Sequence, residues 1–277
     1  MGGGDLEPAP PGLDICWVEC RSAGDGPPAN ALLYRPLAPR ADRRGALLYI
    51  HGGGYVSGSA LRDDPAVRAL ALALDCVVLS VEYRLAPETP YPGALDDVYA
   101  GLAWLHEQAQ ALDVDPARIA VRGNSAGGGL AAALTFLARD RGVFRIALLV
   151  LVYPMLDDRT EAHPVAGRHV WTPHANRFGW SSYLAGSPDA ASERGYAVPA
   201  RGVNLAGLPP TWIGTGGLDL FVEENLEFGR RLLRAGIPTE LHVYPAAYHG
   251  FNLIATAAVA QRFERDLRAA LVRVFST

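Results

Sequence analysis

The sequence predicts an α/β fold, built on a mostly parallel, eight-stranded sheet with helices on both faces. Short apolar runs alternate with helical patterns along most of the 277 residues, and this alternation is typical of βαβ units. One apolar run, Ala46–Ile50, contains no polar residue, as expected for a parallel strand that is covered by helices on both sides.

The expected elements follow from hydrophobic periodicity and from turn signals. Two strands open the chain, and strands then alternate with helices. The strands are Leu13–Cys20, Asn30–Tyr34, Ala46–Ile50, Cys76–Glu82, Arg118–Arg122, Arg145–Tyr153, Thr211–Thr215 and Glu240–Tyr244. The helices are Ala94–Gln110, Ala126–Arg139, Val222–Ala235 and Ala257–Phe275.

No linker or change of composition divides the chain, so we expect a single domain over residues 1–277. The regular pattern fails between Leu156 and Leu208, where Pro, Gly, His and aromatic residues are frequent. One short helix is expected there, around Asn176–Leu184. We interpret residues 157–208 as a cap insertion that follows the sixth strand.

The composition excludes several classes of partner. The net charge is −4, and no run of Lys or Arg could bind a phosphate backbone, so nucleic acid is not expected as a partner. The longest apolar run, Ile146–Leu156, contains a proline and is much shorter than the roughly 20 residues that a membrane helix needs. Membrane insertion is therefore not expected.

The sequence also favours a cytoplasmic location. The first residues have neither the basic flank nor the apolar stretch of a signal peptide. Cys16 and Cys20 lie four residues apart in an expected strand, so their α-carbons would be about 13 Å apart and could not form a disulfide. Free cysteines suit a reducing compartment.

A serine lies at a sharp junction between a strand and a helix. The strand ending at Arg122 runs into Gly123-Asn124-Ser125-Ala126-Gly127, and a helix of small residues follows at once. Glycines two residues before and after the serine remove the β-carbons that would clash in such a turn. The pattern indicates a nucleophile elbow with Ser125 as the nucleophile. The alternative is a glycine-rich turn with an ordinary serine.

A second glycine-rich loop, His51-Gly52-Gly53-Gly54-Tyr55, also begins where a buried strand ends. Its glycines leave backbone amides unshielded, and neighbouring parallel strands bring such loops to one crevice. We therefore expect the amides of Gly53, Gly54 and Ala126 to bind an oxyanion. A flexible glycine loop without function is the alternative.

A serine nucleophile needs a base within hydrogen-bond reach, and histidine is the usual one. Of the seven histidines, His249 is the best placed, because it follows the last strand at the carboxyl edge of the sheet. His242 alternates with its neighbours inside that strand, so we expect it on a strand face. The others lie in the glycine loop, a helix and the insertion: His51, His106, His163, His169 and His174.

The carboxylate that orients the base is expected to be Asp219. It lies just past the seventh strand, and it gives the chain order serine, acid, histidine. Asp219 could instead satisfy the first turn of the helix that begins nearby. Glu223 and Glu224 are the alternatives as the acid, and Asp157 and Asp158, after the sixth strand, are more remote candidates.

Taken together, these motifs resemble the hormone-sensitive-lipase-like branch of the α/β hydrolases, also called bacterial family IV esterases. The similarity covers nearly the whole chain from about Ala46 onward. In that family the matching positions carry, in order, the oxyanion hole, a structural loop, the nucleophile, a sheet edge, the acid and the base. The matching segments are His51–Gly54, Glu82–Glu88, Ser125–Gly128, Tyr153–Pro154, Asp219 and His249–Phe251.

The resemblance implies an α/β-hydrolase fold and short-chain acyl esters as substrates. Two departures from the family pattern stand out. Asn124 precedes the nucleophile where the family usually has Asp, Glu or Thr, so hydrogen bonding and pH dependence nearby are expected to differ. The family builds an N-terminal cap from helices, but only 50 residues precede His51 and two strands occupy much of that length. We expect the N-terminal cap to be reduced or absent, and the site to be unusually open.

The expected function is hydrolysis of a small-molecule ester through an acyl-enzyme, without a metal or other cofactor. Amide or formamide hydrolysis by the same residues is one alternative. A small-molecule receptor is another, because the plant gibberellin receptor resembles this family but lacks the histidine that is present here. A homodimer is one option for the oligomeric state, which the sequence leaves open. The insertion offers four aromatic residues as pocket walls: Trp171, Phe178, Trp180 and Tyr183.

Overall fold

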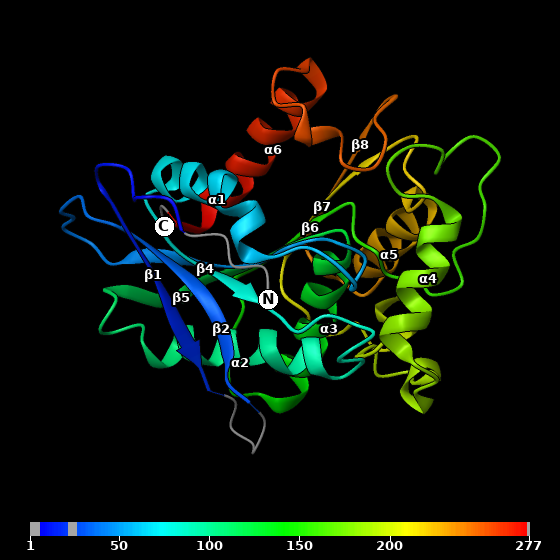
Figure 1. Ribbon diagram of the computed structural model, residues 1–277, viewed down its shortest axis with the longest axis horizontal. Coiled ribbons are helices and arrows are strands. Elements are labelled where there is room, and N and C mark those ends of the chain that lie inside the picture. The colour runs from blue at the N-terminus through cyan, green and yellow to red at the C-terminus, as the bar shows by residue number, and fades with distance from the viewer. Residues whose placement is uncertain (1–5, 22–26, 276–277) are drawn as a thin grey trace.

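The computed structural model describes residues 6–21 and 27–275. Within these residues the chain forms an eight-stranded sheet in the order β1-β2-β4-β3-β5-β6-β7-β8 (Figure 1). Strand β2 pairs antiparallel with β1 and with β4, and the other neighbours pair in parallel. The strands are β1 (Leu13–Cys20), β2 (Ala29–Pro36), β3 (Arg44–Ile50), β4 (Val77–Glu82), β5 (Val114–Asn124), β6 (Leu148–Val152), β7 (Thr211–Gly216) and β8 (Thr239–Tyr244).

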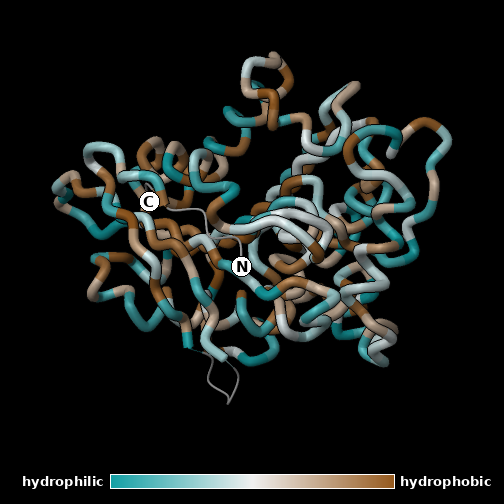
Figure 2. Tube along the Cα trace, in the orientation of Figure 1, coloured by the Kyte–Doolittle hydropathy of each residue, from teal (hydrophilic) through white to brown (hydrophobic). Residues whose placement is uncertain are grey.

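Helices cover both faces of this sheet (Figure 1). Helices α1 (Ala60–Leu74) and α6 (Ala258–Phe275) pack on one face, and α2 (Gly93–Glu107), α3 (Ala126–Arg141) and α5 (Val222–Arg234) pack on the other. The hydrophobic residues in Figure 2 follow the strands and the inner sides of the helices. Every residue of β3 and β6 is buried, as expected for strands in the middle of a covered sheet.

The predicted fold class is confirmed, and each predicted strand has a counterpart in the sheet. One helix, α1, was not predicted. It begins after Ser59, whose hydroxyl accepts a hydrogen bond from the amide of Arg62 at 3.0 Å. Pro65 lies inside this helix, where it cannot donate a backbone hydrogen bond, and a proline at such a position weakens a helical pattern.

The chain between β6 and β7 contains α4 (Pro173–Leu184) and two short 3₁₀ helices, Pro188–Ala191 and Pro199–Arg201. Helix α4 begins three residues before the predicted Asn176. It packs against the loop after β3, where the rings of Tyr55 and Tyr183 stack with centroids 4.1 Å apart. The role of residues 157–208 as a cap, the reduced N-terminal cap and the single domain over residues 1–277 stay predictions.

All three cysteines, Cys16, Cys20 and Cys76, are free. Among the described helices, none is both long enough and apolar enough to span a bilayer. The predicted cytoplasmic location stays a prediction. The prediction that the chain does not begin with a signal peptide rests mainly on residues 1–5, which lie outside the described residues.

Candidate active site

The serine at the β5–α3 junction has the backbone of a strained turn. Ser125 has φ 55° and ψ −119°, a conformation that costs a non-glycine residue on the order of 1–3 kcal/mol. The neighbouring strand holds it there, because the Ser125 amide donates to the carbonyl of Val152 at 2.9 Å and its carbonyl accepts from the amide of Met155 at 3.0 Å. The hydroxyl makes no capping hydrogen bond to α3. It is therefore available to another partner.

Close backbone contacts explain the glycines around this serine. A β-carbon on Gly123 would lie 2.0 Å from the carbonyl oxygen of Gly127. A β-carbon on Gly127 would lie 2.3 Å from the carbonyl oxygens of both Ile50 and His51. Neither position has room for a side chain, so these glycines let the elbow fold tightly and let the end of β3 approach it.

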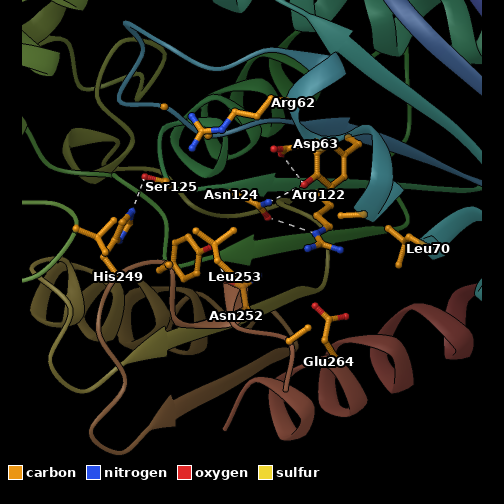
Figure 3. A pocket seen from close by; sticks show the side chains of 18 of the residues that line it. Arg62, Asp63, Leu70, Arg122, Asn124, Ser125, His249, Asn252, Leu253 and Glu264 are labelled. Carbon is orange, nitrogen blue, oxygen red and sulfur yellow. Dashed lines mark hydrogen bonds between the residues drawn. The ribbon is translucent and has the colours of Figure 1, made fainter. Parts of the chain in front are cut away.

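Three side chains from three strand ends form one hydrogen-bonded chain. The Oγ of Ser125 lies 2.9 Å from Nε2 of His249, and Nδ1 of His249 lies 2.8 Å from Oδ2 of Asp219 (Figure 3). Ser125 and His249 are each 6% exposed, and Asp219 is fully buried. The structure thus brings together the three residues predicted as nucleophile, base and acid. With Nδ1 protonated toward the carboxylate, Nε2 can accept the serine proton.

The loops after β7 and β8 are joined to each other, and this fixes Asp219 beside His249. The amide of Leu218 donates to the carbonyl of Ala247 at 2.8 Å, and the amide of Gly217 donates to the carbonyl of Tyr244 at 2.9 Å. The second carboxylate oxygen of Asp219, Oδ1, accepts from the amide of Phe221 at 3.0 Å. The carboxylate is therefore held by a backbone donor as well as by the imidazole.

The glycine loop lies directly against the serine. A β-carbon on Gly52 would lie 3.4 Å from the β-carbon of Ser125. Gly53 and Gly54 have φ values of 132° and 62°, which glycine adopts without strain. Among the described residues, the amides of Gly53, Gly54 and Ala126 have no hydrogen-bond acceptor. The binding of an oxyanion by these three amides stays a prediction.

His51, at the start of this glycine loop, is held by contacts with Tyr83. It is 1% exposed, and its ring stacks on the ring of Tyr83 with centroids 4.1 Å apart. The hydroxyl of Tyr83 donates to the backbone carbonyl of His51 at 3.0 Å. Burial lowers the pKa of His51, so the neutral ring is favoured. The motif that begins at Glu82 therefore positions the glycine loop through Tyr83.

The alternative acids lie elsewhere. Glu224 accepts a hydrogen bond from the amide of Leu156 at 2.6 Å, and Glu223 is exposed and pairs with His163 at 3.3 Å. Asp157 binds Arg159, and Asp158 binds Arg201, each through both carboxylate oxygens. Of the five acidic candidates, Asp219 is the one that contacts His249.

Of the four aromatic residues suggested as pocket walls, the structure places only Trp171 on the wall of the cavity that contains Ser125. Trp180 and Tyr183 are buried and pack on Tyr55. Phe178 is 55% exposed. The suggestion was wrong for these three, because α4 turns Trp180 and Tyr183 toward the protein core and Phe178 toward solvent.

Three polar residues that line the cavity around Ser125 were not predicted as part of the site. The ring of Tyr153 packs edge-on against His249 at 4.6 Å, and its hydroxyl donates to Oδ1 of Asn252 at 2.6 Å. Arg122 lines the same cavity, which has a volume of about 780 Å³. Arg122 and Asn124 lie two apart on one strand, so they share a face, and this signal could have placed Arg122 near the site.

Comparison with known proteins identifies the family. A family model described as the alpha/beta hydrolase fold matches residues 47–253. The chain belongs to the α/β hydrolase family. The resemblance to its hormone-sensitive-lipase-like branch is confirmed by the named relatives.

Among those relatives, "Esterase LipI" of Mycobacterium tuberculosis is 35% identical over 230 residues, which cover 82% of this chain and 71% of LipI. "Carboxylesterase NlhH" of the same organism is 36% identical over 250 residues, which cover 86% of this chain and 76% of NlhH. The solved structure of "Bacterial Heroin Esterase" superposes with a TM-score of 0.90 at 39% identity, over 96% of this chain and 85% of that one.

Proposed function

We propose that this protein is a serine carboxylic-ester hydrolase that acts on short-chain acyl esters. The observation that carries the proposal is the hydrogen-bonded chain from Ser125 through His249 to Asp219. Relatives named as esterases and carboxylesterases support the reaction class. The short acyl chain is an inference from the family resemblance.

In the first half-reaction, the Oγ of Ser125 attacks the ester carbonyl while His249 Nε2 takes the hydroxyl proton. The carbonyl oxygen becomes an oxyanion, which the amides of Gly53, Gly54 and Ala126 would stabilise. Removing one such donor typically costs 10²–10³-fold in rate, about 3–4 kcal/mol. The intermediate then collapses, the bond to the alcohol oxygen breaks, and the alcohol leaves with the proton from His249.

In the second half-reaction, His249 removes a proton from water, and the resulting hydroxide attacks the acyl carbon of the Ser125 ester. Collapse of this second intermediate releases the carboxylic acid and returns the proton to the Oγ of Ser125. The buried carboxylate of Asp219 keeps the imidazole in the correct tautomer and stabilises its charged form during both steps.

Replacement of the serine tests the proposal. Ser125→Ala should abolish the hydrolysis of para-nitrophenyl butyrate, while circular dichroism and thermal unfolding stay close to those of the wild-type protein. Ser181→Ala is the matched control, because Ser181 is exposed on α4 and its hydroxyl donates to the carbonyl of Phe178. Retention of activity by the Ser125→Ala protein would refute the assignment.

A series of para-nitrophenyl esters from acetyl to dodecanoyl tests the acyl length. We expect kcat/KM to be largest for the short acyl chains. A maximum at the long acyl chains would contradict the short-chain part of the proposal and leave the reaction class unchanged.

A further inference from the structure

An arginine on the wall of the cavity that contains Ser125 is buried, and among the described residues it has no carboxylate partner. Arg122 lies on β5, three residues before Ser125, and only 5% of it is exposed. In the described parts of the chain, no carboxylate oxygen lies within 4.0 Å of its guanidinium. Charged side chains are rarely buried unless they are paired, because removing a charge from water is costly.

Among the described residues, the other buried arginine and a partly buried one are both paired. Arg44 is 8% exposed and contacts Asp75 at 3.0 Å. The side chain of Arg68 is 12% exposed and contacts Asp64 at 2.8 Å. Arg122 therefore differs from these two arginines, because its guanidinium does not contact a carboxylate.

The contacts that Arg122 does make are weak. Its Nε donates to Oδ1 of Asn124 over a long 3.4 Å, and its guanidinium lies 5.2 Å above the ring of Tyr49. Within the described residues, its two terminal nitrogens have no hydrogen-bond acceptor. A guanidinium has five N–H donors, so most of its capacity to bind an anion is unused.

The nearest polar network does not neutralise Arg122. The amide of Asn124 donates to the hydroxyl of Tyr49 at 2.7 Å, and that hydroxyl donates to Oδ2 of Asp63 at 2.9 Å. The carboxylate of Asp63 thus accepts a hydrogen bond from Tyr49 and does not pair directly with the guanidinium of Arg122. This network orients Asn124 and fixes the ring on which Arg122 lies.

One cavity joins Arg122 to the serine. Figure 3 shows Ser125 and His249 on one side of it and Arg122 on its wall, between α1 and α6 in this view. Positive residues outnumber negative ones on the wall, and Glu264 faces Arg268 at 3.9 Å. The charged residues of the wall are Arg62, Asp63, Arg122, Glu264, Arg265 and Arg268.

We propose that Arg122 binds a carboxylate carried by the ester substrate while the ester carbonyl lies at Ser125. This inference rests on the proposed esterase function and narrows its substrate class. The α-carbons of the two residues are about 10 Å apart along the strand, so the carboxylate must be separated from the ester by a chain of several atoms. The planar fork of a guanidinium suits a carboxylate, which it can bind through two hydrogen bonds.

Two pairs of esters test the proposal and show which half of the substrate carries the charge. Monoethyl suberate has its carboxylate on the acyl half, and the butanoyl ester of ω-hydroxyhexanoate has it on the alcohol half. Each is compared with the analogue in which a primary amide replaces the carboxylate. We expect wild-type kcat/KM to favour the charged member of at least one pair by about 10- to 100-fold, the usual range for a hydrogen-bonded charge.

Variants on the same strand locate the effect. Arg122→Gln should remove the preference for the charged ester over its amide analogue, mainly by raising KM for the charged ester. Arg122→Lys should retain part of the preference, because the charge remains without the fork. Arg118→Gln is the matched control, since Arg118 is also on β5 but pairs with Asp115 outside the cavity.

The outcomes separate the two proposals. Hydrolysis of the uncharged esters without a preference for either charged ester would overturn the anion site and leave the esterase function intact. A preference that survives in the Arg122→Gln protein would also overturn it. Failure to hydrolyse any ester would contradict the proposed function itself. The ratio of kcat/KM for a charged ester to kcat/KM for its amide analogue is measured on the wild-type protein alone. The test therefore stands even if Arg122→Gln does not fold.

Discussion

Two buried carboxylates follow β7 within six residues of each other, and they have different roles. Asp219 is fully buried and contacts the imidazole of His249, whereas Glu224, 8% exposed, contacts the amide of Leu156 and the hydroxyl of Thr160. The first carboxylate belongs to the candidate active site, and the second fixes the start of the chain between β6 and β7. Burial alone therefore does not identify the carboxylate of the site. The hydrogen-bond partner of each carboxylate does.

The surroundings of the two carboxylates also differ in charge. Asp219 meets an imidazole that can carry a positive charge. Around Glu224 the contacts are a backbone amide and a hydroxyl, and burial raises the pKa of this carboxyl well above its usual value. We therefore expect the loss of Asp219 to affect catalysis and the loss of Glu224 to affect stability.

The largest effect is expected for Asp219→Asn. With its oxygen held by the amide of Phe221, the new side-chain amide would turn its NH2 group toward Nδ1 of His249, so the wrong tautomer is favoured and kcat should fall by about 10⁴-fold. Thermal unfolding should change little, because the amide oxygen can still accept from Phe221. Measurement of kcat with para-nitrophenyl butyrate checks this. If kcat decreased by less than tenfold, Asp219 would be excluded as the orienting acid.

The next effect is expected for Glu224→Ala. This change leaves the buried amide of Leu156 without its acceptor, which should lower the free energy of unfolding by about 2–3 kcal/mol. Denaturant titration measures the change, and kcat should stay far above that of Asp219→Asn. If Glu224→Ala were as inactive as Asp219→Asn with unchanged stability, the proposed division of roles would be wrong.

A pH series with Glu224→Gln sharpens the same comparison. Because the pKa of Glu224 is raised, its folded form favours the protonated carboxyl, and this stabilisation is lost as the pH rises toward the raised pKa. Above the usual glutamate pKa, the wild-type protein should lose about 1.4 kcal/mol per pH unit relative to the uncharged variant. Unfolding free energies of both proteins over this pH range give the result. A constant difference would show that Glu224 is ionised throughout.

The smallest effect is expected for Glu223→Gln. The Glu223 side chain is 79% exposed and its contact is His163. Exposed ion pairs contribute little, so both kcat and the free energy of unfolding should stay near the wild-type values, the latter within about 0.5 kcal/mol. A large loss of activity would make Glu223 a candidate again for the carboxylate that orients His249.

The sequence predicted Ser125, Asp219 and His249 as neighbours because all three follow strands that were expected to be parallel. Parallel strands place their carboxyl ends at one edge, so positions far apart in the chain must meet there. The glycines of the elbow supported this, since each occupies a place where a β-carbon has no room.

The same reasoning could not give the surroundings of Arg122. Its strand was predicted, but whether a carboxylate reaches a buried guanidinium depends on how α1 and α6 pack over the sheet. Helix α1 was not predicted, since Pro65 interrupts its pattern, although Ser59 is a typical N-terminal cap. Sequence periodicity likewise did not separate Trp171, on the cavity wall, from Trp180, in the core.

Covalent labelling with a fluorophosphonate tests the central claim most directly, since this reagent phosphonylates a serine that an adjacent base activates. Mass spectrometry of the labelled wild-type protein should find one phosphonyl group, located on the peptide that contains Ser125, and none on the Ser125→Ala protein. An adduct on another residue, or ester hydrolysis by a protein that is never labelled at Ser125, would contradict the account.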